Sequence, residues 1–275
     1  MRFSVIIPVY NGGEKTLRTI RSVLDQSVVA DRSVAVEIIV ADGGSTDDTV
    51  AMIEGLNEPC IQIASEQDRG MYDALSKGLR RAEGDVTCWV GAGEVFEPHA
   101  FSVVRDVFDA HPQIKWLTGR ATVRNAFGQV IDSLLPSPFR RDLIIRGQYG
   151  TRLQVIQQES TFWRTELNDL LDMEKLASTR LAGDFYVWKC FASQHDLYVV
   201  NSTLGSFTIE PGQLSKLDPR GYKRELRQLR KWPGPRARLS ALMLRKRTKH
   251  SIPRKSAERL VTYDQGKAAW TLQRD

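Results

Sequence analysis

The sequence predicts an α/β fold with a mostly parallel central sheet flanked by helices. Hydrophobic residues make up 41% of the 275-residue chain and charged residues 26%, which is typical of a globular protein and excludes a disordered or fibrous one. In the first third of the chain, short β-rich runs alternate with segments of helical periodicity, joined by short turns. This alternation indicates parallel strands covered on both faces, and such sheets bind ligands at the carboxyl ends of their strands.

Strands and helices are predicted in alternating order over this first third. The predicted strands are the apolar runs 3–9, 36–42, 61–64 and 86–90. The predicted helices are 14–26, a helix after Ser45, which can cap its N-terminus, and 71–82.

The remainder divides into a second half of the same domain and a basic extension. We expect a helix over 98–108, antiparallel strands within 114–135, a helix over 183–193 and strand character over 198–209. Beyond Pro211, Arg and Pro dominate the composition. The predicted domain therefore spans 1–219, with halves 1–97 and 98–219, and a basic helical tail spans 220–275.

The charge distribution separates the tail from the body. The net charge is +6, but residues 220–275 hold 17 Lys and Arg against 4 Asp and Glu, or +13, which leaves −7 for residues 1–219. An anionic partner would therefore bind the tail. Leu239, Leu242 and Met243 can share one helical face there, which is typical of helices on anionic membranes. A nucleic-acid partner is disfavoured because aromatic residues are sparse in the tail.

Several classes of protein are excluded or disfavoured. No apolar run approaches the roughly 18 residues that span a bilayer. The apolar N-terminus lacks a small-residue cleavage site, so it indicates a buried strand better than a signal peptide. The cysteines at 60, 88 and 190 form neither a disulfide framework nor a zinc pattern. We expect a cytoplasmic protein. Peripheral attachment to the inner face of the plasma membrane through the tail is an open alternative.

Polar residues follow the predicted strands. Asp42 ends a strand beside Gly43 and Gly44, where its carboxylate can accept hydrogen bonds from a nucleobase or ribose; alternatively it caps the next helix. The segment 8–11 could equally be a strand terminus. Their joint occurrence with 65–74 and 77–78 favours a site.

With these blocks the chain resembles the family 2 glycosyltransferases of the GT-A fold, closest to bacterial enzymes of exopolysaccharide, colanic-acid-type and lipopolysaccharide assembly. The matching blocks are Ser-Val-Ile-Ile-Pro-Val-Tyr-Asn at 4–11, Glu-Ile-Ile-Val-Ala-Asp-Gly-Gly-Ser-Thr-Asp at 37–47 and Asp-Arg-Gly-Met-Tyr-Asp-Ala-Leu-Ser-Lys-Gly at 68–78. The resemblance implies that residues 1–97 bind a nucleoside diphosphate sugar (a UDP- or GDP-sugar) and that 98–219 bind the acceptor. The implied donor-binding residues are Pro8, Val9, Tyr10, Asn11, Asp42, Asp68, Arg69, Tyr72, Lys77 and Gly93. Helix packing for Tyr72 and a solvated helix face for Lys77 remain alternatives.

The chain departs from the family pattern after the fourth strand. Where the family places an Asp-x-Asp motif for a divalent cation, residues 91–94 are Gly-Ala-Gly-Glu. Glu94 is the remaining metal candidate, and one carboxylate with diphosphate oxygens can hold Mg²⁺ or Mn²⁺. The degenerate motif puts the metal requirement in doubt, and a surface loop acid is the other interpretation of Glu94.

The resemblance also implies the acceptor side. Gln158, Glu159 and Trp163 match the segment of a polar pair before a Thr-Phe-aromatic-Arg strand, and Asp184 matches the catalytic carboxylate. Inverting transfer needs a base that takes the acceptor hydroxyl proton, so Asp184 is the candidate, with an N-cap role as its alternative. Residues 212–215 resemble a loop that closes over the donor phosphates.

The predicted function is thus inverting transfer of a sugar to a bacterial surface glycan or a polyprenyl-diphosphate-linked acceptor. One alternative is a donor-binding pseudoenzyme or scaffold. A sugar nucleotidyltransferase is another, disfavoured because residues 10–14 lack a Gly-rich basic loop. A dinucleotide-dependent oxidoreductase is disfavoured because no Gly-x-Gly-x-x-Gly follows the first strand.

Overall fold

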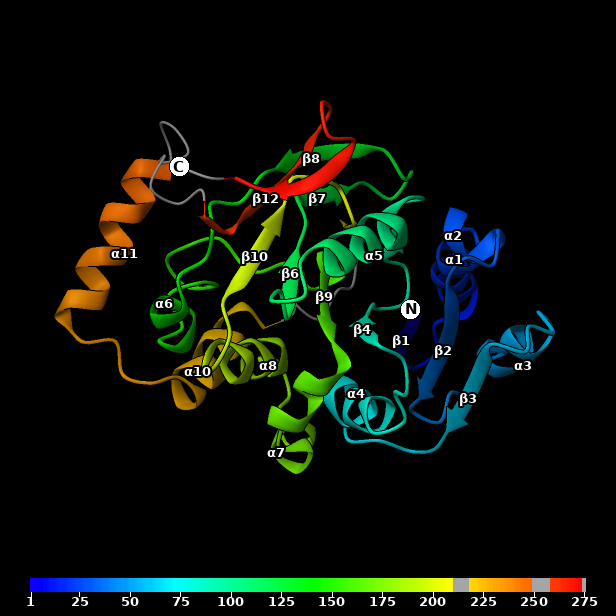
Figure 1. Cartoon of the computed structure of the whole chain (residues 1–275). Coiled ribbons are helices and arrows are strands. Elements are labelled where there is room, and N and C mark those ends of the chain that lie inside the picture. The colour runs from blue at the N-terminus through cyan, green and yellow to red at the C-terminus, as the bar shows by residue number, and fades with distance from the viewer. Residues whose placement is uncertain (210–217, 249–257, 274–275) are drawn as a thin grey trace.

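A large mixed sheet forms the centre of the molecule (Figure 1). The computed structural model describes residues 1–209, 218–248 and 258–273. The sheet has nine strands in the order β13-β12-β10-β6-β9-β4-β1-β2-β3, and most of its strand pairs are parallel. Its strands are β1 (Arg2–Val9), β2 (Ala35–Asp42), β3 (Ile61–Ser65), β4 (Val86–Trp89), β6 (Trp116–Thr118), β9 (Thr161–Arg164), β10 (Leu197–Val200), β12 (Leu260–Asp264) and β13 (Ala269–Leu272). The predicted α/β class is confirmed.

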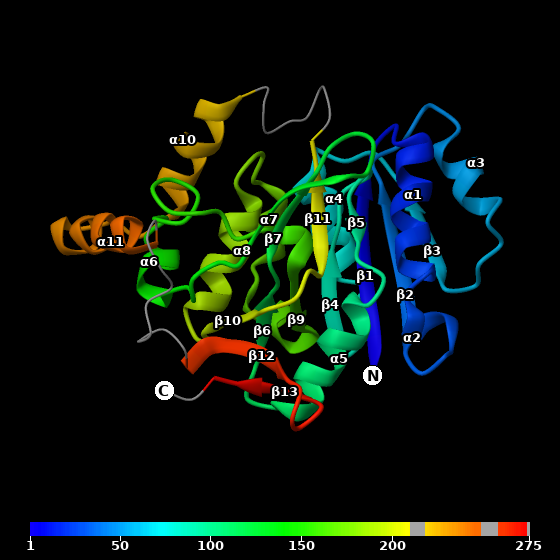
Figure 2. The ribbon, with the colours of Figure 1, turned by 90° about the horizontal axis from the view of Figure 1, so that it is seen from above.

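Helices cover both faces of this sheet (Figure 2). The helices of the first half are α1 (Gly13–Leu24), α2 (Ser27–Ala30), α3 (Thr49–Glu54), α4 (Met71–Leu79) and α5 (Ala100–Ala110). The second half adds α6 (Arg141–Ile145), α7 (Met173–Ala177) and α8 (Gly183–Ala192), and the 3-10 turns η1 (Gln158–Ser160) and η2 (Thr165–Leu170). The tail contributes α10 (Pro219–Leu229) and α11 (Pro235–Thr248).

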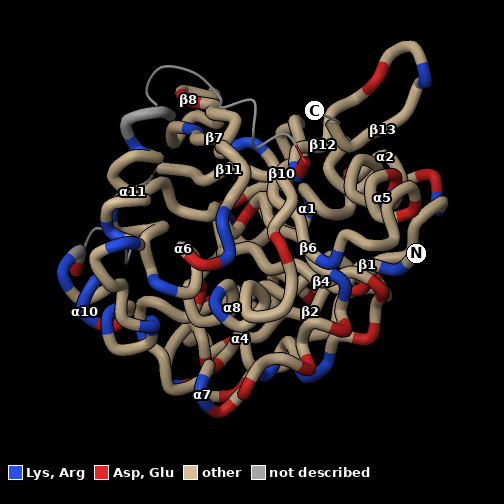
Figure 3. Tube along the Cα trace, turned by 60° about the vertical axis from the view of Figure 1, so that its left-hand side comes forward, with Lys and Arg blue, Asp and Glu red and all other residues tan. Residues whose placement is uncertain are grey.

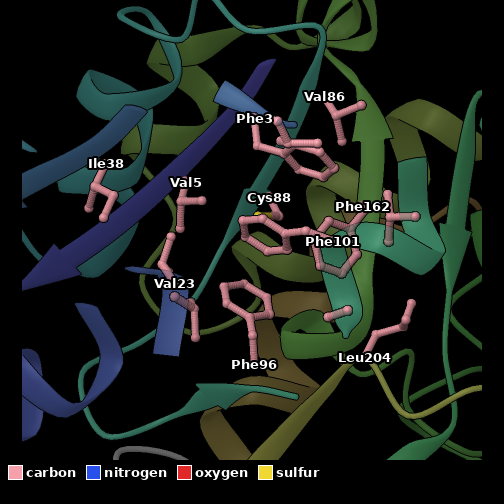
Figure 4. Packing of buried hydrophobic residues seen from close by; sticks show 14 of the residues in the cluster. Phe3, Val5, Val23, Ile38, Val86, Cys88, Phe96, Phe101, Phe162 and Leu204 are labelled. Carbon is pink, nitrogen blue, oxygen red and sulfur yellow. The ribbon is translucent and has the colours of Figure 1, made fainter. Parts of the chain in front are cut away.

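Strand β1 shows why two hydrophobic cores form. Successive side chains of a strand point to opposite faces, and the mostly apolar strand β1 is buried on both. Phe3, Val5 and Ile7 join one cluster, in which Phe3 stacks on Phe101 of α5 with ring centroids 4.5 Å apart (Figure 4). Ile6 points to the other cluster, beneath α4 and α8. The two clusters hold α1 and α4 on opposite sides of β1.

Strand register brings the ends of β1 and β2 to the same edge of the sheet. Val9 pairs with Asp42, and Asp42 pairs in turn with Ser65 of β3. The loops after these three strands therefore lie side by side, as the parallel-sheet prediction required.

A smaller sheet lies beside the large one, in the order β5-β11-β7-β8. It consists of β5 (Val95–Phe96), β7 (Ala121–Arg124), β8 (Val130–Leu134) and β11 (Gly205–Thr208). The antiparallel β7–β8 pair confirms the strands predicted within 114–135, while β6 instead joins the large sheet.

The C-terminal segment is only partly helical. Helices α10 and α11 agree with the predicted extension, but β12 and β13 form a hairpin at the edge of the large sheet, where Val199 of β10 pairs with Leu260. Leu260 and Val261 are buried, because this apolar run covers the sheet edge. Figure 3 shows Lys and Arg along α10 and α11. In the described part of the chain, no helix has the length and apolar character to cross a bilayer. The loop predicted at 212–215 lies outside the described residues.

Candidate active site

The loop after β2 is tied to the end of β1 by side-chain hydrogen bonds. The backbone N–H of Asn11 donates to Ser45 Oγ at 2.8 Å, and the amide oxygen of Asn11 accepts from the Thr46 N–H at 2.8 Å. Ser45 therefore does not cap α3 as predicted, since its hydroxyl is used in this link; Asp48 occupies the N-cap position. Asn11 has φ +51°, a left-handed conformation that Asn tolerates better than most residues.

Asp42 organises this loop from within. Its Oδ2 accepts from Ser65 Oγ at 2.6 Å and from the N–H groups of Ser45 and Gly44 at 2.9 and 3.1 Å, and Oδ1 accepts from Ser45 Oγ. Burial alone would raise the pKa of Asp42, but these hydrogen bonds outweigh it and hold the pKa below its usual value. Asp42 is 2% exposed, so its first role is to shape the loop.

A shallow hollow of about 240 Å³, measured to its open mouth, lies beside this loop. Asp68 reaches into it across Gly43, where an added Cβ would come within 2.4 Å of Asp68 Oδ2. Burial raises the pKa of Asp68. The Lys77 ammonium lies 3.5 Å from Glu66 and donates to the Gln67 carbonyl at 3.1 Å. The lining residues are Ile39, Ala41, Asp42, Ala64, Glu66, Asp68, Ala74, Lys77, Gly78 and Arg81.

Four other predicted donor residues differ in accessibility. Tyr10 is 61% exposed directly after β1, whereas Val9 is 5% exposed and Pro8 is buried inside the strand. The Arg69 side chain is bound to Asp73, at 3.2 Å from both carboxylate oxygens. The Tyr10 ring is therefore exposed at the edge of the sheet, and the buried Pro8 and Val9 anchor the strand that precedes it.

Tyr72 is buried between the two halves of the domain. Its ring fills the space above Gly183, where an added Cβ would lie 2.3 Å from Tyr72 Cδ1, and its hydroxyl donates to the Leu181 carbonyl at 3.4 Å. The packing role left open for Tyr72 is thus observed. Through it, the start of α4 contacts the start of α8.

The turn at 91–94 follows β4 and is held by α1. Gly93 has φ +98°, its N–H donates to Thr19 Oγ1 at 2.9 Å, and its carbonyl accepts from Arg18 at 3.1 Å. Within the turn, Glu94 Oε2 accepts from the Gly91 N–H at 2.9 Å. The glycines let the chain fold back so that the Glu94 carboxylate faces η1.

Glu94 meets two residues that were predicted on the acceptor side. Gln158 Nε2 donates to Glu94 Oε2 at 3.2 Å, while Gln158 Oε1 accepts from Trp89 Nε1 at 2.7 Å. The carboxyl groups of Glu94 and Glu159 are neighbours, and the titration of each affects that of the other. Burial raises the pKa of both, and the charge of Glu94 raises that of Glu159 further.

This acid pair suits a hard dication in its chemistry. Two adjacent carboxyl groups supply the oxygen ligands that Mg²⁺ and Mn²⁺ prefer, and Mg²⁺ commonly uses only one or two carboxylates. Within the described ranges, no group of three His, Cys, Asp or Glu side chains is placed to hold a metal. Any further ligands would have to come from a bound diphosphate and water.

Trp163 does not lie at a site. It is 0% exposed in β9, its Nε1 donates to Asn168 at 2.9 Å, and its ring packs edge-on against Trp89 at 5.5 Å. Strand β9 lies between β4 and β6 and is covered on both faces, so its aromatic residues are core residues. The sequence motif was informative about the strand and wrong about the accessibility of this residue.

Asp184 lies in the first turn of α8 with no capping hydrogen bond, so the N-cap alternative is not observed. Its Oδ2 accepts from the Tyr222 hydroxyl at 3.2 Å. Its Oδ1 is buried and has no hydrogen-bond partner among the described residues. Burial raises the pKa of Asp184 to about 6, although hydrogen bonds, including that from Tyr222, act to lower it.

A half-open recess of about 260 Å³, measured to its mouth, borders Asp184. Trp188, one turn further along α8, also borders it, and its Nε1 is a second buried polar atom without a partner in the described chain. Two residues that line the recess thus each carry a buried polar atom without a partner among the described residues, and most of the other lining residues are apolar. Its lining residues are Ile144, Tyr149, Gly150, Val155, Ile156, Asp184, Phe185, Trp188 and Tyr222.

The sequence-based list missed Trp188 and Tyr222. Trp188 could have been found, because it lies four residues after Asp184 in a predicted helix and so shares its face. Tyr222 could not, because it belongs to the segment that composition assigned to a separate tail.

Comparison with known proteins supports this assignment of fold and family. Residues 4–148 match the family model for glycosyl transferase family 2. An uncharacterized glycosyltransferase of Mycobacterium tuberculosis is 29% identical over 171 residues, covering 60% of this chain and 59% of that protein. The chondroitin synthase of Escherichia coli is 27% identical over 107 residues, covering 38% of this chain and 15% of that protein. The chain thus matches less than two thirds of the length of these relatives.

Two solved structures share the fold at low sequence identity. S. aureus TarS 1–349 in complex with UDP-GlcNAc has a TM-score of 0.61 at 18% identity, covering 78% of this chain and 60% of that one. The mannosyltransferase PcManGT of Pyrobaculum calidifontis, in complex with GDP-Man and Mn²⁺, has a TM-score of 0.59 at 16% identity, covering 91% and 70%. The expected GT-A fold is confirmed. With the family model matching more than half of its residues, the chain belongs to glycosyl transferase family 2.

Proposed function

We propose that this protein transfers a sugar from a nucleoside diphosphate sugar to an acceptor hydroxyl, with inversion at the anomeric carbon, and that Asp184 is the base. One observation carries the proposal: Asp184 borders an open recess, and its Oδ1 is buried with no hydrogen-bond partner among the described residues. A buried carboxylate oxygen without a hydrogen bond is costly, so a position of this kind favours a ligand that donates to it. An acceptor hydroxyl is such a donor.

The step follows from this geometry. The acceptor hydroxyl gives its proton to Asp184 as its oxygen forms a bond to the anomeric carbon from the side opposite the leaving group. The bond from that carbon to the diphosphate breaks, and the nucleoside diphosphate leaves with the electron pair. Trp188 Nε1 can donate to another acceptor oxygen, and the apolar walls suit the C–H face of a sugar ring.

The donor would bind at the carboxyl ends of β1 to β3. The exposed ring of Tyr10 offers a stacking surface for the base, Asp68 a carboxylate for base or ribose, and Lys77 a cation for the diphosphate. Asp42 would support donor binding by holding the loop after β2 in shape. Tyr72 would support it by packing the start of α4 against the start of α8. The fold neighbours bound to UDP-GlcNAc and GDP-Man support a UDP- or GDP-sugar.

A divalent cation would be held by Glu94 and Glu159. When bound, Mg²⁺ or Mn²⁺ would neutralise charge on the leaving diphosphate. The two carboxyl groups are neighbours before any cation binds. Gln158 and the Gly91 N–H fix the Glu94 carboxylate in this orientation. The Mn²⁺ complex of the archaeal fold neighbour is in line with this assignment.

The acceptor would be a membrane-held or surface glycan, reached through α11. Ala237, Ala241 and Leu244 of α11 turn toward the body, whereas Leu239, Leu242 and Met243 are 47 to 54% exposed. The nearby Trp232 is 68% exposed, with the Arg238 guanidinium 5.6 Å from its ring. An exposed apolar stripe on a helix of net positive charge suits the surface of an anionic bilayer.

Donor binding is the first test of this function, because it needs no acceptor. Titration with UDP, GDP, UDP-GlcNAc and GDP-mannose, with and without Mn²⁺, should show binding of at least one nucleotide. Release of UDP or GDP with water as acceptor then distinguishes an enzyme from a donor-binding scaffold. Binding without release by any of the sugars would favour the scaffold, and absence of binding by all four would contradict the proposed function.

A further inference from the structure

Helix α10 packs across the start of α8, the helix that carries Asp184. Leu226 of α10 is buried against Ala182 and Phe185. The two segments approach so closely that an added Cβ on Gly221 would lie 2.7 Å from Leu181 Cδ1. A segment assigned by its composition to a basic tail is therefore built into the acceptor side of the domain.

Glu225 satisfies the backbone at the start of α8. Its carboxylate accepts from three consecutive N–H groups, those of Arg180, Leu181 and Ala182, at 2.7, 2.6 and 2.8 Å. These three residues immediately precede α8, with Ala182 at its N-cap position, and a carboxylate is the strongest acceptor that a side chain offers to backbone N–H groups. Three such bonds hold the chain two residues before Asp184.

Tyr222, one turn earlier on α10, reaches the Asp184 side chain itself. Its hydroxyl donates a hydrogen bond to Asp184 Oδ2 at 3.2 Å and leaves Oδ1 unbound by Tyr222. Tyr222 and Asp184 both border the recess. With Oδ2 bound by Tyr222, the carboxylate is held in one orientation, and Oδ1 is the oxygen without a partner among the described residues.

We propose that Tyr222 and Glu225 are positioning residues for Asp184, so that the C-terminal segment completes the active site and controls the charge of its base. The inference rests on the proposed role of Asp184. It differs from a purely structural role of α10, because the two residues act on the carboxylate in opposite senses. The Tyr222 hydroxyl stabilises the carboxylate by donating to it, whereas the negative charge of Glu225 destabilises it.

A further titratable group that faces Asp184 is on α4. The Tyr72 hydroxyl is buried, and burial, followed by the charge of Asp184, raises the pKa of Tyr72 well above its usual value. It stays neutral near neutral pH and does not titrate with Asp184. In the described part of the chain, Tyr222 and Glu225 are thus the side chains that oppose each other at this carboxylate.

Direct titration of Asp184 tests the inference without an acceptor. Full-length protein is labelled with ¹³C at the aspartate carboxyl carbons, the Asp184 signal is identified by its loss in D184N, and its chemical shift is followed with pH. Y222F should raise the midpoint by about 0.5 to 1 pH unit, and E225Q should lower it by a similar amount. The matched controls Y263F, in β12, and E54Q, in α3, change the same chemical groups at exposed positions away from α8 and should leave the midpoint unchanged.

Opposite shifts support the inference; no shift, or shifts in the same direction, would overturn it. If E225Q does not fold, Y222F decides alone, because Phe keeps the ring and removes only the donor. Release of UDP from UDP-GlcNAc, or of GDP from GDP-mannose, is measured in parallel on D184N. Nucleotide release by D184N at the wild-type rate would contradict the proposed base role of Asp184 without changing the titration result. Failure of the proposed function and failure of this inference are therefore distinguishable.

Discussion

The ring of Tyr72 occupies the space where any side chain at position 183 would begin. An added Cβ on Gly183 would lie 2.3 Å from Tyr72 Cδ1 and 2.6 Å from Thr179 Oγ1, distances that real Cβ atoms essentially never show. The contact joins the first turn of α4, which borders the proposed donor site, to the first turn of α8, which carries Asp184. The distance between α4 and α8 at this contact therefore depends on residue 183 having no side chain.

Gly183→Ala should displace α8 and lower both stability and turnover. Overpacking a rigid contact of this kind costs about 1 to 3 kcal/mol, measured as the loss in the free energy of unfolding in urea. Gly55→Ala is the control, because its added Cβ meets only backbone at 3.4 Å, an ordinary contact. Equal stability and equal nucleotide release for the two variants would show that the Tyr72–Gly183 contact does not set this spacing.

Asp42→Asn should destabilise the loop after β2 in a pH-dependent way. The folded-state pKa of Asp42 is lowered, so its carboxylate stabilises the fold above its unfolded pKa of about 3.9 and loses that contribution as the pH falls through the lower folded value. The difference in melting temperature between wild type and D42N should be constant at neutral pH and shrink below about pH 4. A difference that stays constant down to pH 3 would contradict this. Nucleotide affinity should also fall, because the loop that Asp42 shapes loses its conformation. D47N is the control, because Asp47 is an acid of the same loop that makes no hydrogen bond with Asp42 in the structure.

Glu94→Gln and Glu159→Gln should each weaken Mn²⁺ binding by the full-length protein in the presence of UDP. A neutral amide is a poorer ligand for a hard dication, so the affinity of each variant should fall about 10-fold or more, as followed by the electron paramagnetic resonance signal of free Mn²⁺. Glu97→Gln, which removes a nearby carboxylate paired with Arg124, is the control. Mn²⁺ affinity that is the same in all three variants and the wild type would remove the metal role of this pair.

Replacing Leu239, Leu242 and Met243 with Ser should release the protein from anionic vesicles. These side chains are exposed on α11, so their loss should leave the fold intact. Sedimentation with phosphatidylglycerol vesicles should fall several-fold, and wild-type binding should weaken as salt rises, since salt screens surface charges. Point substitutions are preferred to truncation, because β12 forms part of the large sheet. The matched control replaces the exposed Val130, Ile131 and Leu134 of β8; equal sedimentation of the two triple variants would contradict the proposal.

Sequence patterns predicted the central sheet well, for a physical reason. Strands β1 and β2 are largely buried on both faces, so their residues are mostly apolar, and Asn-Gly-Gly and Asp-Gly-Gly mark the turns that follow. Local signals of this kind need no knowledge of distant contacts. Sequence analysis did not predict the hairpin β12–β13. The basic composition of the surrounding residues favoured a helical extension, and the apolar run Leu260–Val261 was too short to indicate a strand.

The candidate site was predictable in its parts but not in its contacts. Asp184 and Glu94 were found by resemblance, yet the hydrogen bond from Tyr222 joins residues 38 positions apart, and the Glu94–Gln158 bond joins residues 64 apart. Trp163 was misassigned because a motif does not reveal that both faces of β9 are covered. Pairings of this kind depend on how whole elements pack, which local sequence does not encode.

The central claim is that Asp184 is the base, and D184N tests it most directly. Asn keeps the size of the side chain and removes its proton-accepting carboxylate. Release of UDP from UDP-GlcNAc, or of GDP from GDP-mannose, should fall about 100-fold or more in D184N, while donor affinity measured by titration stays within about twofold. The wild-type rate should fall as the pH drops through about 6, because burial raises the pKa of Asp184 to that value and the protonated carboxyl cannot act as a base. Release at the wild-type rate by D184N, with donor affinity unchanged, would contradict the account.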